Sequence, residues 1–224
     1  MDHFRYIVPY IITALFIYAL LVIVMFFQQR SLVFVPDRQD AFTQGLGGGE
    51  RIIFETEDGL TLKGWYKAGD IQKNRLTIVM FHGNAGHHGN RIPDSDIFTK
   101  AGYGYAILGY RGYGANPGSP SEQGFYKDAR AFIEALSKKD DISIEEMVLY
   151  GESLGTGVAM KMAEEFDVAA IMLEAPYTTT IDRARELYPW LPVGWLMRDR
   201  FNNIDRVKEI NKPLLILHGE KDQT

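Results

Sequence analysis

The sequence contains no cysteine among its 224 residues. Disulfide bonds, thiolate nucleophiles and zinc sites built from cysteine are therefore excluded. Basic side chains are not concentrated either, because 24 lysines and arginines are outnumbered by 29 acidic residues and form no run. With a formal charge of −5 and no cluster of basic residues, the sequence lacks the positive charge that nucleic-acid phosphates require, so we expect no DNA or RNA partner.

Charged side chains are absent from Tyr6 to Phe27. As a helix, this run crosses a hydrocarbon core of about 30 Å, so we expect a single membrane span over residues 6–27, within an anchor unit of residues 1–30. The alternative is a cleaved signal peptide, but the run exceeds the usual length of about 7 to 15 residues and no small-x-small site follows it. Arg5 and Arg30 flank the span too evenly to indicate which side of the membrane the remaining chain occupies.

Residues 31–224 have the length and apolar content of one globular domain. An alternating hairpin pattern surrounds Asp58-Gly59. Short apolar runs then occupy residues 76–81, 104–108, 147–150, 169–173 and 214–217. Helical patterns over 121–136, 154–166 and 204–210 separate most of them. This alternation predicts an α/β fold with a doubly wound, mostly parallel sheet, in which ligands bind beyond the carboxyl ends of the strands.

The pentapeptide Gly151-Glu152-Ser153-Leu154-Gly155 directly follows one of these apolar runs and precedes a helical pattern. A sharp turn at this place lifts a serine oxygen off the end of the sheet, and it closes only if the residues two before and two after are very small. Leu154 offers its backbone N–H at the start of the helix. We therefore expect Ser153 to be a nucleophile, with a plain glycine-rich turn as the alternative.

The segment His82-Gly83-Asn84-Ala85-Gly86 follows the first of the central apolar runs. A backbone N–H of Asn84, paired with that of Leu154, is a candidate oxyanion hole. A phosphate loop is disfavoured because no Lys-Ser/Thr follows the glycines, and a metal site is disfavoured because the histidines lack a ligand spacing. We expect His82 to pack at the strand end, His87 and His88 to be solvated, and no metal or cofactor to be required.

A carboxylate follows the last apolar run, in Leu217-His218-Gly219-Glu220-Lys221-Asp222. In this architecture the acid that orients the catalytic histidine comes after the serine in the chain, which favours Asp222. Glu174, at the end of the preceding run, is the alternative acid. Its simpler role is a hydrogen-bonding carboxylate at the rim of the sheet.

Five motifs in this order resemble the α/β-hydrolase superfamily. They are H-G-N-A-G at 82–86, Y-R-G-Y-G at 110–114, G-E-S-L-G at 151–155, L-E-A-P-Y at 173–177 and H-G-E-K-D at 218–222. The set is most similar to membrane-anchored serine esterases related to serine aminopeptidase and prolyl-oligopeptidase-like hydrolases. The resemblance implies that Ser153 is the nucleophile, that Asn84 and Leu154 form the oxyanion hole, and that Asp222 is the acid.

The same resemblance places a catalytic histidine beyond the acid, after a further strand. The sequence ends at Thr224, and none of its five histidines occupies that position. We therefore expect a C-terminally truncated chain in which the last strand and helix of the fold are missing and residues 214–217 form an apolar edge. Such a chain should be close to inactive.

Residues 177–203 form a cap-like segment between the last two apolar runs. Its side chains Tyr188, Trp190, Trp195 and Met197 are candidates for an acyl pocket near the bilayer, with simple packing of a cap as the alternative. In the 110–114 loop, we expect Arg111 to hydrogen-bond backbone carbonyls at the rim of the site.

Two classes of function remain. The first is a single-pass membrane serine hydrolase that cleaves a carboxylic ester, thioester or amide of a small-molecule or lipid-like acyl substrate through an acyl-enzyme. The second is a non-catalytic, membrane-tethered binding or scaffold protein with the same fold, because fold alone does not establish function.

Overall fold

The computed structural model describes residues 2–43 and 45–219, and the side chains from residue 6 onward. Its helices and strands are, in chain order, α1 (Asp2–Val33), β1 (Glu50–Glu55), β2 (Thr61–Lys67), β3 (Thr77–Phe81), η1 (His88–Arg91), α2 (Ser95–Lys100), β4 (Gly104–Ile107), α3 (Glu122–Leu136), η2 (Ile144–Glu146), β5 (Met147–Glu152), α4 (Leu154–Glu165), β6 (Ala170–Glu174), α5 (Thr180–Leu187), α6 (Val193–Leu196), α7 (Asn203–Arg206) and β7 (Leu214–Leu217).

The strands form a mixed seven-stranded sheet in the order β1-β2-β4-β3-β5-β6-β7. β1 and β2 are the predicted antiparallel hairpin, and β2 is also antiparallel to β4. The strands from β3 to β7 all run parallel, which confirms the predicted mostly parallel α/β fold. The chain proceeds from β3 to β4 in one direction and from β4 across β3 to β5 in the other. This reversal opens a crevice beyond the ends of β3 and β5.

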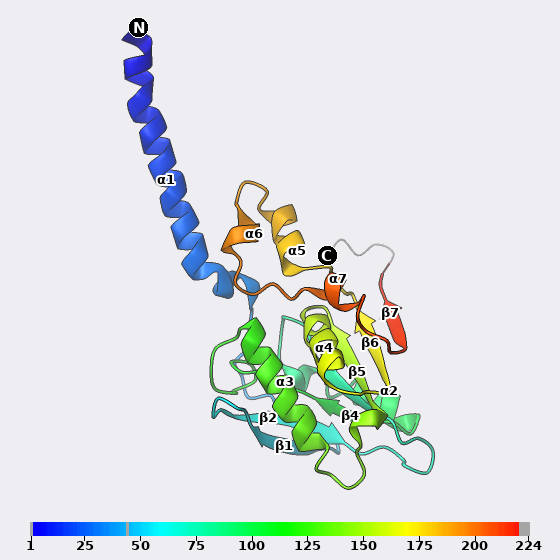
Figure 1. Ribbon diagram of the computed structural model, residues 1–224. Coiled ribbons are helices and arrows are strands. Elements are labelled where there is room, and N and C mark those ends of the chain that lie inside the picture. The colour runs from blue at the N-terminus through cyan, green and yellow to red at the C-terminus, as the bar shows by residue number, and fades with distance from the viewer. Residues whose placement is uncertain (1, 44, 220–224) are drawn as a thin grey trace.

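Helices cover both faces of the sheet (Figure 1). On one face α3 and α4 bury a core that includes Phe125, Phe132 and Val158. On the opposite face Trp65 and Tyr105 pack with Phe98 of α2. Burial on both faces explains why the central strands read as continuous apolar runs.

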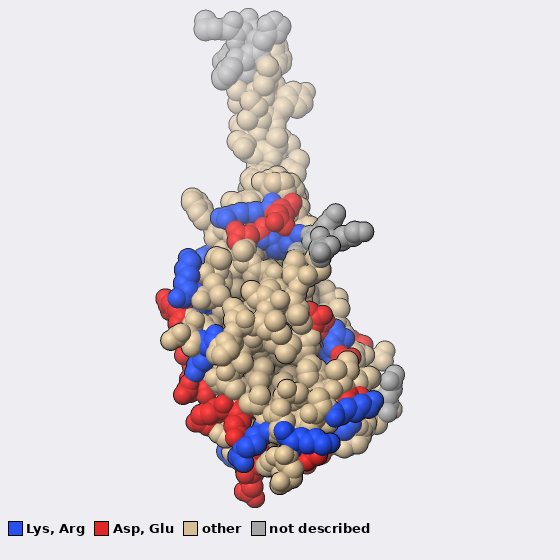
Figure 2. Space-filling view, turned by 90° about the vertical axis from the view of Figure 1, so that its right-hand side faces the viewer, with Lys and Arg blue, Asp and Glu red and all other residues tan. Residues whose placement is uncertain are grey.

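Helix α1 projects from the domain, with α5 and α6 beside its lower end (Figure 1). The stretch Tyr6–Val33 is long and apolar enough to cross a membrane, and its most apolar window has a mean hydropathy of 2.7 with no residue buried. Figure 2 shows the shaft of this helix free of charged side chains, with acidic and basic residues gathered where it meets the domain. The helix therefore continues beyond the expected span of residues 6–27.

The last two elements of the described chain are α7, which is shorter than predicted, and β7, which is exposed. Helix α7 has four residues instead of the seven expected over 204–210, because turns through Ile210 replace its second half. Strand β7 pairs with β6 only, within the described residues, and its four side chains are each at least 36% exposed. Figure 2 looks onto this side of the molecule and shows a largely uncharged surface bordered by charges.

Candidate active site

Ser153 lies between the end of β5 and the start of α4, with φ 47° and ψ −113°. A positive φ is costly for a residue with a side chain, and such strain persists only where the surroundings enforce it. Its N–H donates to the Glu174 carbonyl at 2.8 Å, which fixes the turn to the neighbouring strand β6. The structure thus places Ser153 at the sharp strand–turn–helix junction expected from the sequence.

The two glycines that flank this turn are required by close packing. A Cβ at Gly155 would lie 1.9 Å from the carbonyl oxygen of Phe81, at the end of β3. A Cβ at Gly151 would lie 2.6 Å from the Cα of Thr156. Neither site accepts a side chain without a backbone shift, which is the steric reason for the spacing of the motif.

Ser153, Leu154 and Asn84 line one cavity of about 280 Å³ in the crevice between β3 and β5. Because Leu154 is the first residue of α4, its backbone N–H has no acceptor within the helix. Ala175, which follows β6, also lines the cavity and is strained at φ 47°. Two residues with strained backbones therefore border the cavity: Ser153 after β5 and Ala175 after β6.

The Asn84 side chain connects this cavity to α1. Its Oδ1 accepts hydrogen bonds from the Val35 N–H and the Tyr113 hydroxyl, both at 3.0 Å. Its Nδ2 donates to the Val33 carbonyl at 2.6 Å. Because the side chain of Asn84 is already hydrogen-bonded, its backbone N–H is the group that could donate to an oxyanion.

An ion pair joins the serine turn to the loop after β3. The Arg91 guanidinium donates to both carboxylate oxygens of Glu152, at 2.7 and 2.5 Å, and the Gly83 N–H approaches the same carboxylate at 3.4 Å. Burial opposes ionisation of Glu152, but Arg91 outweighs it and lowers the pKa of this carboxyl. Glu152, the residue before Ser153, is therefore ionised, and its ion pair with Arg91 fixes the serine turn to the loop after β3.

His82 packs at the end of β3, as expected. It is 1% exposed, lies against Tyr110 with ring centroids 4.5 Å apart, and its Nδ1 lies 2.8 Å from the Gly83 carbonyl. Burial lowers its pKa to about 4, so its ring is neutral near pH 7.

The expectation that His87 and His88 are solvated is wrong. Both are buried, at 8% and 0% exposure, because residues 34–43 fold back over their loop. Pro36 forms a β-bridge with Gly86, and Phe42 packs edge-on against His88 at 5.2 Å between ring centroids. Sequence patterns gave no sign of this long-range contact.

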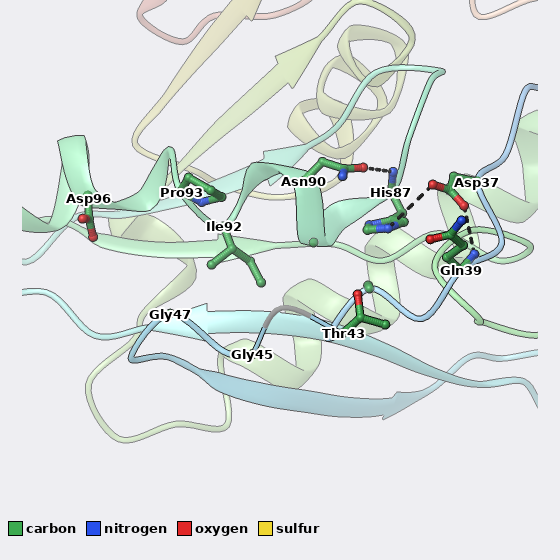
Figure 3. A pocket seen from close by; sticks show the side chains of 12 residues that line it. Asp37, Gln39, Thr43, Gly45, Gly47, His87, Asn90, Ile92, Pro93 and Asp96 are labelled. Atoms are coloured by element: carbon green, nitrogen blue, oxygen red, sulfur yellow. Dashed lines mark hydrogen bonds and ion pairs between the residues drawn. The ribbon is translucent and has the colours of Figure 1, made fainter.

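A second cavity, of about 300 Å³, lies where this returning segment meets the loop after β3 (Figure 3). His87 points toward Asp37 with 3.9 Å between Nε2 and the carboxylate, and its N–H donates to Asn90 at 2.8 Å. This cavity contains none of the predicted site residues, and the described chain has no group of three or more potential metal-ligating His, Asp or Glu side chains.

The candidate pocket residues of the 177–203 segment divide into two pairs. Tyr188 and Met197 line the Ser153 cavity, and Met197 is 8% exposed. Trp190 and Trp195 are not among the lining residues, and Trp195 is 92% exposed. The segment packs against α1 through a cluster of Leu191, Val193 and Met197 with partly buried side chains of that helix, and against the main core through Tyr177 and Phe201.

Arg111 differs from its expected role at backbone carbonyls. Its guanidinium pairs with two carboxylates, Asp58 at 2.8 Å and the fully buried Asp128 at 2.7 Å. The side-chain hydrogen bond from Arg111 is the main reason that the pKa of Asp58 is lowered. The 110–114 loop is therefore anchored inside the domain by charge, and Tyr110 and Tyr113 are fully buried.

The remaining catalytic candidates lie elsewhere. Asp222 is outside the described residues. Glu174 accepts a hydrogen bond from the Tyr150 hydroxyl at the sheet rim. Among the residues that the structure describes, no histidine lines the cavity that contains Ser153.

The sequence matches the serine aminopeptidase, S33, family (Hydrolase_4) over residues 72–204, which include β3, the serine turn and the cap. The chain belongs to this family of α/β hydrolases. The uncharacterized protein Rv2307c of Mycobacterium tuberculosis is 34% identical over 197 residues, which cover 87% of this chain and 70% of that protein.

Solved structures show the same α/β-hydrolase fold. An α/β hydrolase from Vibrio vulnificus superimposes with a TM-score of 0.64 at 22% identity, covering 77% of this chain and 64% of its own. The esterase Pf2001 of Pyrococcus furiosus gives a TM-score of 0.59 at 20% identity, over 75% of this chain and 68% of its own. At these identities the likeness extends to the fold alone.

Sequence reasoning missed one part of the site. Leu32 and Val33, in the last turn of α1, line the Ser153 cavity together with residues of the cap. The apolar run indicated a membrane span, and nothing in its composition indicated that its end forms a wall of a site. The contact depends on how the chain turns back after residue 33.

Proposed function

We propose that this protein is a serine hydrolase that cleaves a carboxylic ester, thioester or amide through an acyl-enzyme at Ser153. The observation that carries the proposal is the strained backbone of Ser153, which faces a cavity shared with Asn84 and Leu154. The Ser153 oxygen attacks the substrate carbonyl carbon and loses its proton to a base. The backbone N–H groups of Asn84 and Leu154 stabilise the charge on the carbonyl oxygen.

The acyl-enzyme then forms as the leaving alcohol, thiol or amine departs with a proton, and water releases the acid. We propose Asp222 as the acid that orients the base. The test is hydrolysis of p-nitrophenyl butyrate by the protein expressed from its complete gene, compared with Ser153→Ala. Loss of turnover in the variant supports the proposal, and equal turnover refutes it.

We further propose that α1 is an uncleaved, single-pass membrane anchor. The continuity between the helix and the domain supports this, because Phe34 is 3% exposed in the main core and Asn84 binds the carbonyl of Val33. Cleavage after Val33 would also remove Leu32 and Val33 from the wall of the Ser153 cavity. N-terminal sequencing of protein that resists carbonate extraction from membranes tests this, and a mature chain that begins after Phe27 contradicts it.

A non-catalytic, membrane-tethered binding protein is the second candidate. It is favoured by the absence of a histidine among the described residues that line the Ser153 cavity. If the complete gene product neither hydrolyses esters nor reacts with a fluorophosphonate, this second candidate replaces the first.

A further inference from the structure

A smaller hollow of about 60 Å³ adjoins the Ser153 cavity, between α1 and the cap. Five residues line both spaces: Leu32, Val33, Ala184, Tyr188 and Met197. The two spaces therefore share walls. A hydrocarbon chain that extends in this direction from a carbonyl group at Ser153 enters the smaller space. We refer to this smaller hollow as the groove.

The groove suits hydrocarbon. Its lining includes no charged residue, and the part beyond the shared walls includes Met25, Leu191 and Val193. The amide of Gln29 is the most polar group there, and it is occupied by the cap backbone. It donates to the Leu196 carbonyl at 3.1 Å and accepts from the Arg198 N–H at 2.8 Å.

The groove also leads along α1. Met25, Gln29, Leu32 and Val33 form one stripe of that helix, and from Val33 to Met25 it rises about 12 Å toward the apolar span. Trp190 and Trp195 project from the cap beside it, at 50% and 92% exposure. Exposed tryptophans favour the interface between headgroups and acyl chains, so we expect this part of the cap to contact the bilayer beside α1.

The cavity discriminates between two kinds of substrate. A peptide with a free amino terminus needs a carboxylate near the serine to bind its ammonium group, and no carboxylate lines the Ser153 cavity among the described residues. A lipid ester needs an apolar path from the bilayer to the serine, which the groove provides. The small volume of the groove, about 60 Å³, leaves no room for a second chain beside the first.

We propose that the substrate is a bilayer lipid ester whose single acyl chain lies in the groove between α1 and the cap, with its carbonyl carbon at Ser153. The inference rests on the proposed function, because it takes the Ser153 hydroxyl oxygen as the nucleophile. It adds that the membrane helix itself forms part of the substrate-binding site. Met25 and Ala184 then set the length of chain that is accepted.

The first experiment measures binding without turnover. The full-length Ser153→Ala protein in phosphatidylcholine vesicles is irradiated with a monoacylglycerol that carries a diazirine midway along a palmitoyl chain. We expect crosslinks on peptides containing Met25 or Met197, and their loss in Met25→Trp. Val24→Trp is the matched control, because Val24 is half exposed and lines neither space. Crosslinks spread evenly along α1, or unchanged in Met25→Trp, overturn the inference.

The second experiment measures chain-length preference in the protein with Ser153 intact. Ala184→Phe narrows the passage from cavity to groove, so hydrolysis of the palmitate ester should fall about tenfold relative to the butyrate ester. Ala101→Phe should leave this ratio unchanged, because Ala101 is exposed and lines neither space, and thermal unfolding verifies that both variants fold. Groove crosslinks without any hydrolysis would refute the enzyme and retain the lipid site. Hydrolysis with an unchanged ratio in Ala184→Phe would refute the groove and retain the enzyme.

Discussion

Arg30, in the last turn of α1, donates two hydrogen bonds to the carboxylate of Asp199 in the cap, at 2.8 and 3.2 Å. The Asp199 side chain is only 5% exposed and also accepts the Glu122 N–H at 2.9 Å. One carboxylate thus ties together α1, the cap and the start of α3. This contact makes α1 a structural part of the hydrolase domain.

The first prediction concerns this junction. Arg30→Ala leaves a buried carboxylate without its cation, so the free energy of unfolding should fall by about 2 kcal/mol. Arg38→Ala is the control, because Arg38 is exposed on the segment that follows the same helix. Denaturant unfolding in detergent micelles measures both. Equal stability of the two variants would show that the junction contributes nothing.

The second prediction concerns the ion pair between Arg91 and Glu152. Arg91→Ala should lower kcat about tenfold or more with little change in KM, because the serine turn and the loop of Asn84 lose their shared fixed point. Arg91→Lys should recover part of the loss, since it keeps the charge but not the paired geometry. Arg75→Ala, which removes a similar pair with Glu146 on the surface, is the control. A rise in KM alone would contradict a positioning role.

The third prediction concerns the glycine two residues after Ser153. Gly155→Ala should destabilise the fold by about 2 kcal/mol or more, since its Cβ would meet the Phe81 carbonyl at 1.9 Å. Gly194→Ala is the control, because its Cβ would approach only the flexible end of Arg185, at 3.2 Å. Thermal unfolding of the two variants measures the difference. Similar melting temperatures would show that the turn is less tightly packed than the structure indicates.

The fourth prediction concerns pH. The pKa of His82 falls from 6.5 to about 4 on folding because of burial, so the unfolded chain binds more protons between these values. Its stabilising contribution is present above pH 6.5 and is lost as the pH falls toward 4, which amounts to about 2 kcal/mol between pH 7 and pH 5. His82→Gln should flatten this dependence. A pH profile unaffected by His82→Gln would contradict the assignment.

The strands and the serine turn were predictable because local chemistry dictates them. A run such as Met147–Tyr150, bounded by turn residues, is typical of a strand covered on both faces, and Gly151 and Gly155 mark a turn that tolerates no side chain. The burial of His87 and His88 was not predictable, because it depends on residues 34–43 returning across the loop. Helix α1 as a wall of the cavity was missed for the same reason: a contact between residues 32 and 153 leaves no local pattern.

The central claim is that Ser153 is the nucleophile, and one measurement tests it most directly. The protein expressed from its complete gene is treated with a fluorophosphonate, digested and sequenced by mass spectrometry, alongside Ser153→Ala and the control Ser143→Ala. We predict that the label lies on Ser153, disappears in Ser153→Ala and persists in Ser143→Ala. A label on another residue, or one that survives in Ser153→Ala, would contradict the account.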